Sequence, residues 1–196
     1  MNQTDKQALR RAVRSRFPGP EARARESGLL CGHVMAWPAY RRAEVVAGYV
    51  PLPWEADITP LLTDVLASGR TLLLPRVEGE KLMTLRRVER LDGLSAGRWG
   101  LPEPPEDAEI VPVEQVQLML VPLEAMDRSG MRLGKGGGYY DTLLAGTEAV
   151  TLGAAMSWQW VERVPCEPWD QPLTAAADSA GIHLIRTKDT ERPMIL

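Results

Sequence analysis

The sequence predicts an α/β fold: a single three-layer domain over residues 1–196, built on an open, mostly parallel sheet flanked by helices. Three observations predict it. Short segments rich in β-branched and apolar residues alternate with segments of helical periodicity. A chain of 196 residues is long enough for one sizeable hydrophobic core. No internal repeat, low-complexity tract or linker divides the chain. In such sheets ligands usually bind beyond the carboxyl ends of the strands.

The first part of the chain predicts two helices followed by a strand. Residues 4–17 are amphipathic, with apolar side chains four apart on one face and three cations four apart on another, Lys6, Arg10 and Arg14. Taken alone, such a basic stripe is typical of a solvated helix face. Residues 18–20, Pro-Gly-Pro, end that helix, and a second helical pattern follows from Ala22 until Pro38 stops it. The valine-rich residues 44–50 predict the first strand, and a loop follows.

The remaining elements continue the alternation of strands and helices. A helix over residues 59–67 precedes a strand over 71–74 that ends at Pro75, which predicts a right-handed parallel crossover. Residues 92–112 are rich in glycine, proline and acids and predict a long ordered loop, a kind of segment that is often functional. The other predicted elements are strands at 83–88, 117–121, 150–155 and 182–185, a turn at 127–130, and helices at 139–145 and 158–162.

Composition and charge argue against several classes of protein. A net charge of −3 with 25% charged residues gives no basis for a nucleic-acid partner. The longest apolar runs fall short of the roughly 20 residues that a membrane-spanning helix needs. Cys31 and Cys166 lack metal-type spacing and follow no signal peptide, and the histidines, His33 and His183, are single. We therefore expect a soluble, monomeric protein of the cytoplasm.

The segment from Arg132 to Asp141, RLGKGGGYYD, carries the strongest functional signal. It places four glycines in five positions between a predicted strand and a predicted helix. Glycines there let the backbone approach a ligand, so that N–H groups and the helix N-terminus can point at phosphate oxygens. The spacing matches neither a Walker A loop nor a dinucleotide fingerprint. A glycine-rich stretch can also be a mere tight connection. The cations of Arg132 and Lys135 and the carboxylate of Asp141 favour phosphate and magnesium instead.

Two further residues are candidates for contact with a heterocyclic substrate. Glu55 lies in the loop after the first strand, where its carboxylate can accept hydrogen bonds from an amide or a pterin-like ring. The alternative is an ordinary surface acid. Trp99, in the long loop, can provide a flat aromatic wall for such a ring. The alternative is a tryptophan that only packs the loop down.

Together these segments resemble the 5-formyltetrahydrofolate cyclo-ligase family, also called 5,10-methenyltetrahydrofolate synthetase. The resemblance covers nearly the whole chain, and its most specific part is the glycine segment, preceded by Val121-Pro122 and the turn at 127–130. Supporting matches are spread along the sequence: Lys6 to Arg10, the loop of Glu55, Leu74-Pro75-Arg76, Trp99 to Pro104, and Pro168-Trp169-Asp170. The fold that the resemblance implies, an open α/β sheet flanked by helices, agrees with the pattern of elements.

The resemblance implies which residues bind ATP and which assist the chemistry. Arg132 and Lys135 would be the catalytic cations that stabilise the transferred phosphoryl group. The residues implied to bind ATP are Lys6, Arg10, Arg132, Leu133, Gly134, Lys135, Gly136, Gly137, Gly138, Tyr139 and Tyr140.

The resemblance also implies a folate site and a magnesium site. Glu55 would bind the folate, with Trp99, Tyr139 and Tyr140 completing the substrate site. Magnesium would be held by Asp141 and Asp170. Two positions depart from the family pattern: Trp169 replaces the usual histidine before Asp170, and Met126 stands where an aromatic residue is common.

The activity implied is the ATP- and Mg²⁺-dependent cyclisation of 5-formyltetrahydrofolate to 5,10-methenyltetrahydrofolate, with release of ADP and phosphate. A formamide oxygen leaves only after conversion into a good leaving group, which ATP can supply. The sequence has no Ser–His or Cys–His arrangement, which agrees with a reaction whose attacking atoms both come from the substrate. The same glycine segment could instead serve a small-molecule kinase or a nucleotide-binding regulator without turnover.

Overall fold

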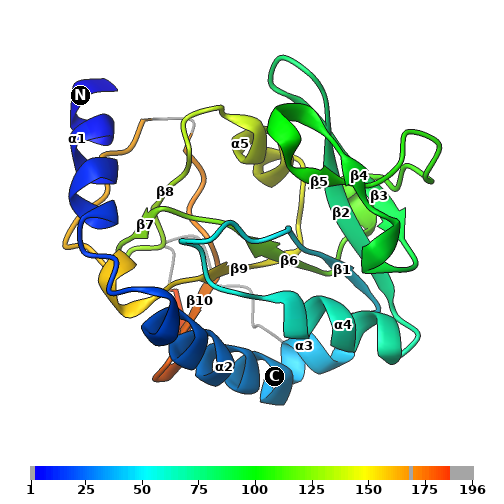
Figure 1. Cartoon of the computed structure of the whole chain (residues 1–196), viewed down its shortest axis with the longest axis horizontal. Coiled ribbons are helices and arrows are strands. Elements are labelled where there is room, and N and C mark those ends of the chain that lie inside the picture. Colours follow the sequence, from blue (N-terminus) through cyan, green and yellow to red (C-terminus); the bar gives the residue numbers. More distant parts are fainter. Residues whose placement is uncertain (1–2, 168–169, 186–196) are drawn as a thin grey trace.

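The computed structural model describes residues 3–167 and 170–185, which form a seven-stranded sheet with helices on both faces (Figure 1). The strand order is β11-β10-β9-β6-β1-β2-β3. Neighbouring strands from β2 to β10 are parallel, whereas the outer strands β3 and β11 are antiparallel additions at the two edges. The predicted α/β class and mostly parallel sheet are thus confirmed.

The bounds of the elements follow the predicted order. The helices are α1 (Gln3–Arg14), α2 (Pro20–Ala36), α3 (Pro38–Arg42), α4 (Thr59–Ala67) and α5 (Tyr139–Ala145). The strands of the large sheet are β1 (Val45–Ala47), β2 (Thr71–Gly79), β3 (Leu82–Val88), β6 (Leu118–Val121), β9 (Val150–Ala154), β10 (Ala175–Asp178) and β11 (Gly181–Leu184). Two short antiparallel pairs join β4 (Ser95–Ala96) to β5 (Pro102–Glu103) and β7 (Ala125–Met126) to β8 (Arg132–Leu133).

Alternate residues of the central strand β6 face two hydrophobic layers. Leu118 and Leu120 pack in the layer that contains the buried residues of α2, α3 and α4. Met119 and Val121 pack in the opposite layer, which includes Leu143 of α5. Burial of both faces is the pattern of a parallel sheet covered by helices, so the arrangement has three layers. Within the described residues, no helix is both long and apolar enough to cross a bilayer.

Strand β2 is longer than the sequence predicts, because it continues through Pro75 to Gly79. The N–H that proline lacks would point toward β1. However, β1 ends at Ala47, opposite Leu73, so no strand requires that hydrogen bond. The second half of β2 pairs with β3 alone and forms a hairpin that reaches past the rest of the sheet.

Other elements also differ from the prediction. Pro38 does not only stop α2 but begins α3, since proline is compatible with the first turn of a helix. The sequence does not predict β10, whose three alanines have little strand propensity and are fixed by pairing with β9 and β11. The predicted loop 92–112 contains the β4–β5 pair. The end of this loop lies along β3, where the backbone N–H of Val111 donates a hydrogen bond to the carbonyl oxygen of Leu85. The helix predicted at 158–162 is a 3₁₀ turn, Ser157–Gln159.

Candidate active site

A cavity of about 1110 Å³ opens at the carboxyl ends of the parallel strands. Its walls come from the segments that follow β1 and β6, from the β2–β3 hairpin, from α1 and from the glycine segment. This is the position expected for a ligand in an α/β sheet. The predicted site residues that line it are Lys6, Arg10, Glu55, every residue from Arg132 to Asp141, and Asp170. The side chain of Trp99 lies outside the described part of the structure.

The glycine segment links the β7–β8 ladder to helix α5. Gly136 and Gly138 have φ values of +98° and +72°, which side chains other than glycine rarely adopt. A Cβ atom on Gly136 would also lie 3.2 Å from a guanidinium nitrogen of Arg10. The backbone conformation therefore favours glycine at position 136, and a side chain there would also crowd the guanidinium of Arg10.

Helix α1 lies beside the β7–β8 ladder (Figure 1). Two of its cations line the cavity. Arg10 donates from Nε to the carbonyl oxygen of Gly134 over 2.8 Å. Lys6 donates from Nζ to Asp170 over 2.7 Å and to Glu167 over 3.3 Å. Partial burial acts to lower the pKa of Lys6, but these carboxylates raise it above its ordinary value, so the ammonium is retained at neutral pH. The basic stripe is thus not simply a solvated face.

Glu55 is buried rather than a surface acid, with 1% of the residue exposed. Its Oε1 atom lies 2.9 Å from Nζ of Lys135, and its Oε2 atom accepts a hydrogen bond from the backbone N–H of Leu52. The family resemblance implies that Glu55 binds the folate and that Lys135 binds phosphate. The structure brings the two side chains into direct contact, so the two assigned regions share a border.

Arg132 and Asp141, at the two ends of the glycine segment, form a second ion pair. Nη2 of Arg132 donates to Oδ1 of Asp141 over 2.7 Å, and only 5% of the arginine side chain is exposed. Burial lowers the pKa of Arg132, whereas the charge of Asp141 opposes that change. The pair closes the glycine segment into a loop whose charged ends both line the cavity.

Comparison with known proteins identifies the family. A family model described as the 5-formyltetrahydrofolate cyclo-ligase family matches residues 2–178. The chain belongs to this family. The 5-formyltetrahydrofolate cyclo-ligase of Escherichia coli strain K12 is 30% identical over 176 residues, which cover 86% of this chain and 96% of that protein.

Solved structures agree with this assignment. The 5,10-methenyltetrahydrofolate synthetase of Aquifex aeolicus superposes with a TM-score of 0.83 at 35% identity, over 93% of each chain. The synthetase of Mycoplasma pneumoniae gives a TM-score of 0.72 at 19% identity, over 89% of this chain and 99% of that one, and it supports the fold alone. The family resemblance predicted from the glycine segment is confirmed.

The carboxylates that the cyclo-ligase resemblance assigns to magnesium, Asp141 and Asp170, line one cavity. Each is paired with a cation, Arg132 or Lys6, and the described residues contain no group of three metal-binding side chains. Mg²⁺ in phosphoryl-transfer sites commonly takes one or two protein carboxylates and completes its shell with phosphate oxygens and water. The two carboxylates therefore fit a metal ion that binds together with a nucleotide and takes its other ligands from phosphate oxygens and water. Trp169, the departure next to Asp170, lies outside the described residues.

Arg14, the third cation of the α1 stripe, has a role that the sequence does not indicate. Its guanidinium binds both carboxylate oxygens of Glu124, a residue only 1% exposed, and lies 5.1 Å from the ring centre of Trp54. Glu124 immediately precedes β7, and Trp54 immediately precedes Glu55. Arg14 thus ties α1 to the start of the glycine-segment ladder and to the loop of the buried acid.

Replacing Arg14 with methionine is expected to lower the free energy of unfolding by about 1–3 kcal/mol, because the buried carboxylate of Glu124 loses its partner. Amide hydrogen exchange in α1 should also accelerate. Urea unfolding and exchange measurements check both effects. The control is Arg11→Met, an exposed arginine of the same helix for which the described residues give no ion pair. Equal stability of the two variants would contradict an anchoring role for Arg14.

Tyr49, which the sequence alone does not single out, follows β1 and lies in the cavity wall with 3% of its surface exposed. The sequence signal that could have identified it is a tyrosine just past the end of a parallel strand, since such positions face ligands.

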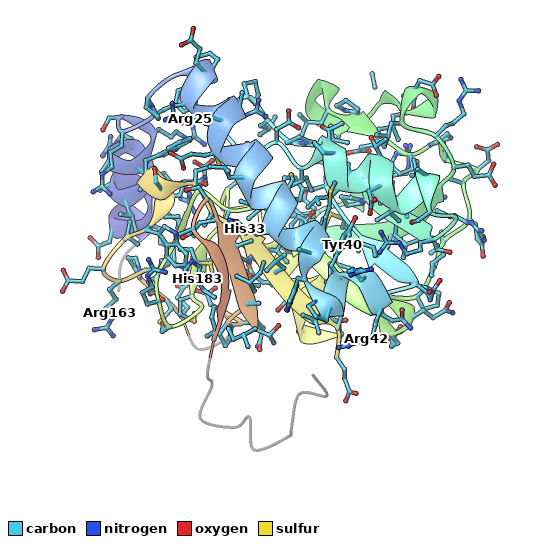
Figure 2. The ribbon with its side chains drawn as sticks, turned by 90° about the horizontal axis from the view of Figure 1, so that it is seen from below. Arg25, His33, Tyr40, Arg42, Arg163 and His183 are labelled. Atoms are coloured by element: carbon cyan, nitrogen blue, oxygen red, sulfur yellow. The ribbon has the colours of Figure 1, made fainter. Side chains whose placement is uncertain are left out.

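Neither histidine lines the cavity: His33 lies on α2 and His183 on β11, the edge strand (Figure 2). His183 pairs with Asp178 and His33 contacts the carbonyl oxygen of Ser179.

Proposed function

We propose that this protein closes 5-formyltetrahydrofolate to 5,10-methenyltetrahydrofolate with ATP and Mg²⁺, and releases ADP and phosphate. One observation carries the proposal: Nζ of Lys135, in the cation-rich glycine segment, lies 2.9 Å from Oε1 of the buried acid Glu55. Phosphate recognition and heterocycle recognition thereby meet in one cavity. The names of the bacterial relatives support the folate substrate. We further propose that this enzyme is a monomer and that it is located in the cytoplasm.

The proposed reaction begins at the formyl group. The formyl oxygen attacks the γ-phosphorus of ATP, the bond to the β–γ bridging oxygen breaks, and ADP leaves. N10 of the folate then attacks the activated formyl carbon. Loss of the N10 proton and departure of phosphate, which takes the former formyl oxygen, leave the methenyl bridge. Because the substrate provides both attacking atoms, the protein acts through positioning and charge.

The proposed work of the side chains follows from their charges. Arg10 and Lys6 bind the polyphosphate from α1, and Arg132 and Lys135 stabilise negative charge on the transferred phosphoryl group. Mg²⁺, held by Asp141 and Asp170, would neutralise phosphate charge when bound. Lys135 exchanges its contact with Glu55 for one with phosphate. The Glu55 carboxylate, then free of the ammonium, accepts hydrogen bonds from the N–H groups of the pterin ring.

Glu55→Gln is expected to raise the KM for 5-formyltetrahydrofolate by roughly tenfold or more, since a buried charge-assisted hydrogen bond is lost. The KM for ATP should change little, or fall as Lys135 is released from its partner. Steady-state kinetics with each substrate varied in turn measure both values. An equal rise in the two KM values, together with lower stability, would instead mean that Glu55 supports the fold.

An oxygen label tests the proposed reaction against its alternatives. With ¹⁸O in the formyl group, the released phosphate should carry the label, one labelled phosphate for each methenyl group formed. A small-molecule kinase would leave a stable phosphorylated product, and a regulator would bind ATP without any product. Unlabelled phosphate accompanying methenyl formation would contradict the attack of the formyl oxygen on ATP.

A further inference from the structure

Two tyrosine hydroxyls in the cavity wall have no evident structural role. The hydroxyls of Tyr49 and Tyr140 are buried, and among the described residues neither has a hydrogen-bond partner. A buried hydroxyl without a partner is destabilising, and phenylalanine would fill the same space without that cost. Both residues line the cavity. The fold therefore does not explain the hydroxyl groups, whereas a polar ligand in the cavity would.

The surroundings of the two phenols define which ligand groups they can meet. The carboxylate of Glu55 acts electrostatically on both phenols, and Tyr140 also acts on Tyr49, so the three groups share one region of the cavity that all three residues line. A tyrosine phenol is a hydrogen-bond donor at ordinary pH. For Tyr49, burial and then the charge of Glu55 raise the pKa further. The guanidinium of Arg132 lies 5.8 Å from the ring centre of Tyr140 and borders this region.

Tyr139 has different surroundings although it is adjacent to Tyr140 in the sequence. Its hydroxyl donates to the carbonyl oxygen of Gly79, at the tip of the β2–β3 hairpin, over 3.3 Å. The side chain thus connects the glycine segment to the hairpin. Of the two tyrosines in the glycine segment, only Tyr140 has a hydroxyl without a partner among the described residues.

We propose that the hydroxyls of Tyr49 and Tyr140 donate hydrogen bonds to the ring carbonyl oxygen of the pterin, beside the N–H groups that Glu55 accepts. This inference rests on the proposed function and names the residues that recognise its substrate. One edge of a pterin carries an amino group, a ring N–H and a carbonyl oxygen in succession. A carboxylate only accepts hydrogen bonds and can satisfy the first two groups. The carbonyl oxygen needs a donor, and neutral phenols next to the carboxylate supply it.

The arrangement has a characteristic consequence for stability. A buried hydroxyl whose hydrogen-bond partner belongs to the substrate lowers the stability of the ligand-free protein, because it is unpaired until the substrate binds. Removal of such a hydroxyl should leave the protein as stable as before, or more stable, and yet weaken substrate binding. A tyrosine with a structural role would behave in the opposite way.

Tyr49→Phe is the test, with Tyr40→Phe as the matched control. Tyr40 is a buried residue of α3 (Figure 2), and it does not line the cavity. Its hydroxyl lies 3.0 Å from the carbonyl oxygen of Leu61 and 2.8 Å from Oδ2 of Asp64. We expect Tyr49→Phe to keep or raise Tm and to raise the KM for 5-formyltetrahydrofolate about three- to tenfold, the effect of one neutral hydrogen bond. Tyr40→Phe should lower Tm and leave that KM unchanged.

The kinetic constants separate the possible roles of the hydroxyl. The kcat value and the KM for ATP should stay within about twofold of the wild-type values, because the lost contact is made equally in the ground and transition states. Tyr140→Phe should likewise raise the KM for the folate without lowering Tm, and the double variant should raise that KM more than either single change. An unchanged KM for the folate in Tyr49→Phe, a fall in kcat alone, or a joint loss of Tm and affinity would each overturn the inference. Wild-type protein that forms no methenyl product would instead overturn the proposed function.

Discussion

Lys135→Ala is expected to lower ATP-dependent turnover by on the order of 10² or more, since one preorganised contact to the transferred phosphoryl group is lost. The lysine side chain is 43% exposed, so its truncation creates no cavity in the core. However, it leaves Glu55 without its cation. The fall should therefore appear in kcat, whereas stability should change less. Single-turnover kinetics with saturating substrates measure the chemical step directly.

The matched control for Lys135 is Arg90→Ala. Arg90 belongs to an exposed ion pair with Asp92, in which both side chains are 71% exposed, and neither residue lines the cavity. Surface pairs of this kind contribute little, so the control should retain both turnover and stability. Equal turnover of Lys135→Ala and the wild type would remove Lys135 from the phosphate site.

Asp141→Asn is expected to have an effect of similar size for a different reason. The substitution keeps the shape of the side chain but removes a proposed magnesium ligand and the counter-charge of the buried Arg132. Turnover should fall by on the order of 10², and the Mg²⁺ concentration for half-maximal rate should rise by roughly 10–100-fold. A titration of the rate with Mg²⁺ at fixed ATP checks both.

Asp92→Asn, the other half of the exposed surface pair, is the control for Asp141→Asn. It removes the same charge from the chain without touching the cavity. A stability measurement completes the comparison, because the change of Asp141 to an uncharged amide leaves Arg132 buried with a weaker partner. An unaltered Mg²⁺ dependence in Asp141→Asn would contradict its role as a metal ligand and restrict it to holding Arg132.

The sequence predicts the fold well where a pattern is local. Alternating apolar segments indicate the central strands, and the glycine segment between β8 and α5 reflects backbone conformations that glycine alone adopts easily. β10 escapes prediction because its residues, three alanines and an aspartate, favour a strand only through their neighbours β9 and β11. The extension of β2 past Pro75 is hidden for a similar reason, since it depends on where β1 ends.

The candidate site is predicted less completely, because its contacts join distant segments. Lys6 and Arg10 reach the cavity, but Arg14, at the same spacing on the same helix, binds Glu124 instead. Spacing alone cannot distinguish the three cations, because the difference arises from which segment each one meets. The burial of Glu124 and the contact of Glu55 with Lys135 likewise follow only from the packing of loops at the carboxyl end of the sheet.

The most direct test of the central claim is the absorbance of purified protein mixed with 5-formyltetrahydrofolate and Mg²⁺, with and without ATP. The proposed reaction produces a methenyl chromophore that absorbs in the near ultraviolet. The band should grow only when ATP is present, at a rate proportional to the protein concentration. A flat trace with protein that still binds ATP would contradict the proposed activity and leave only the fold and the family.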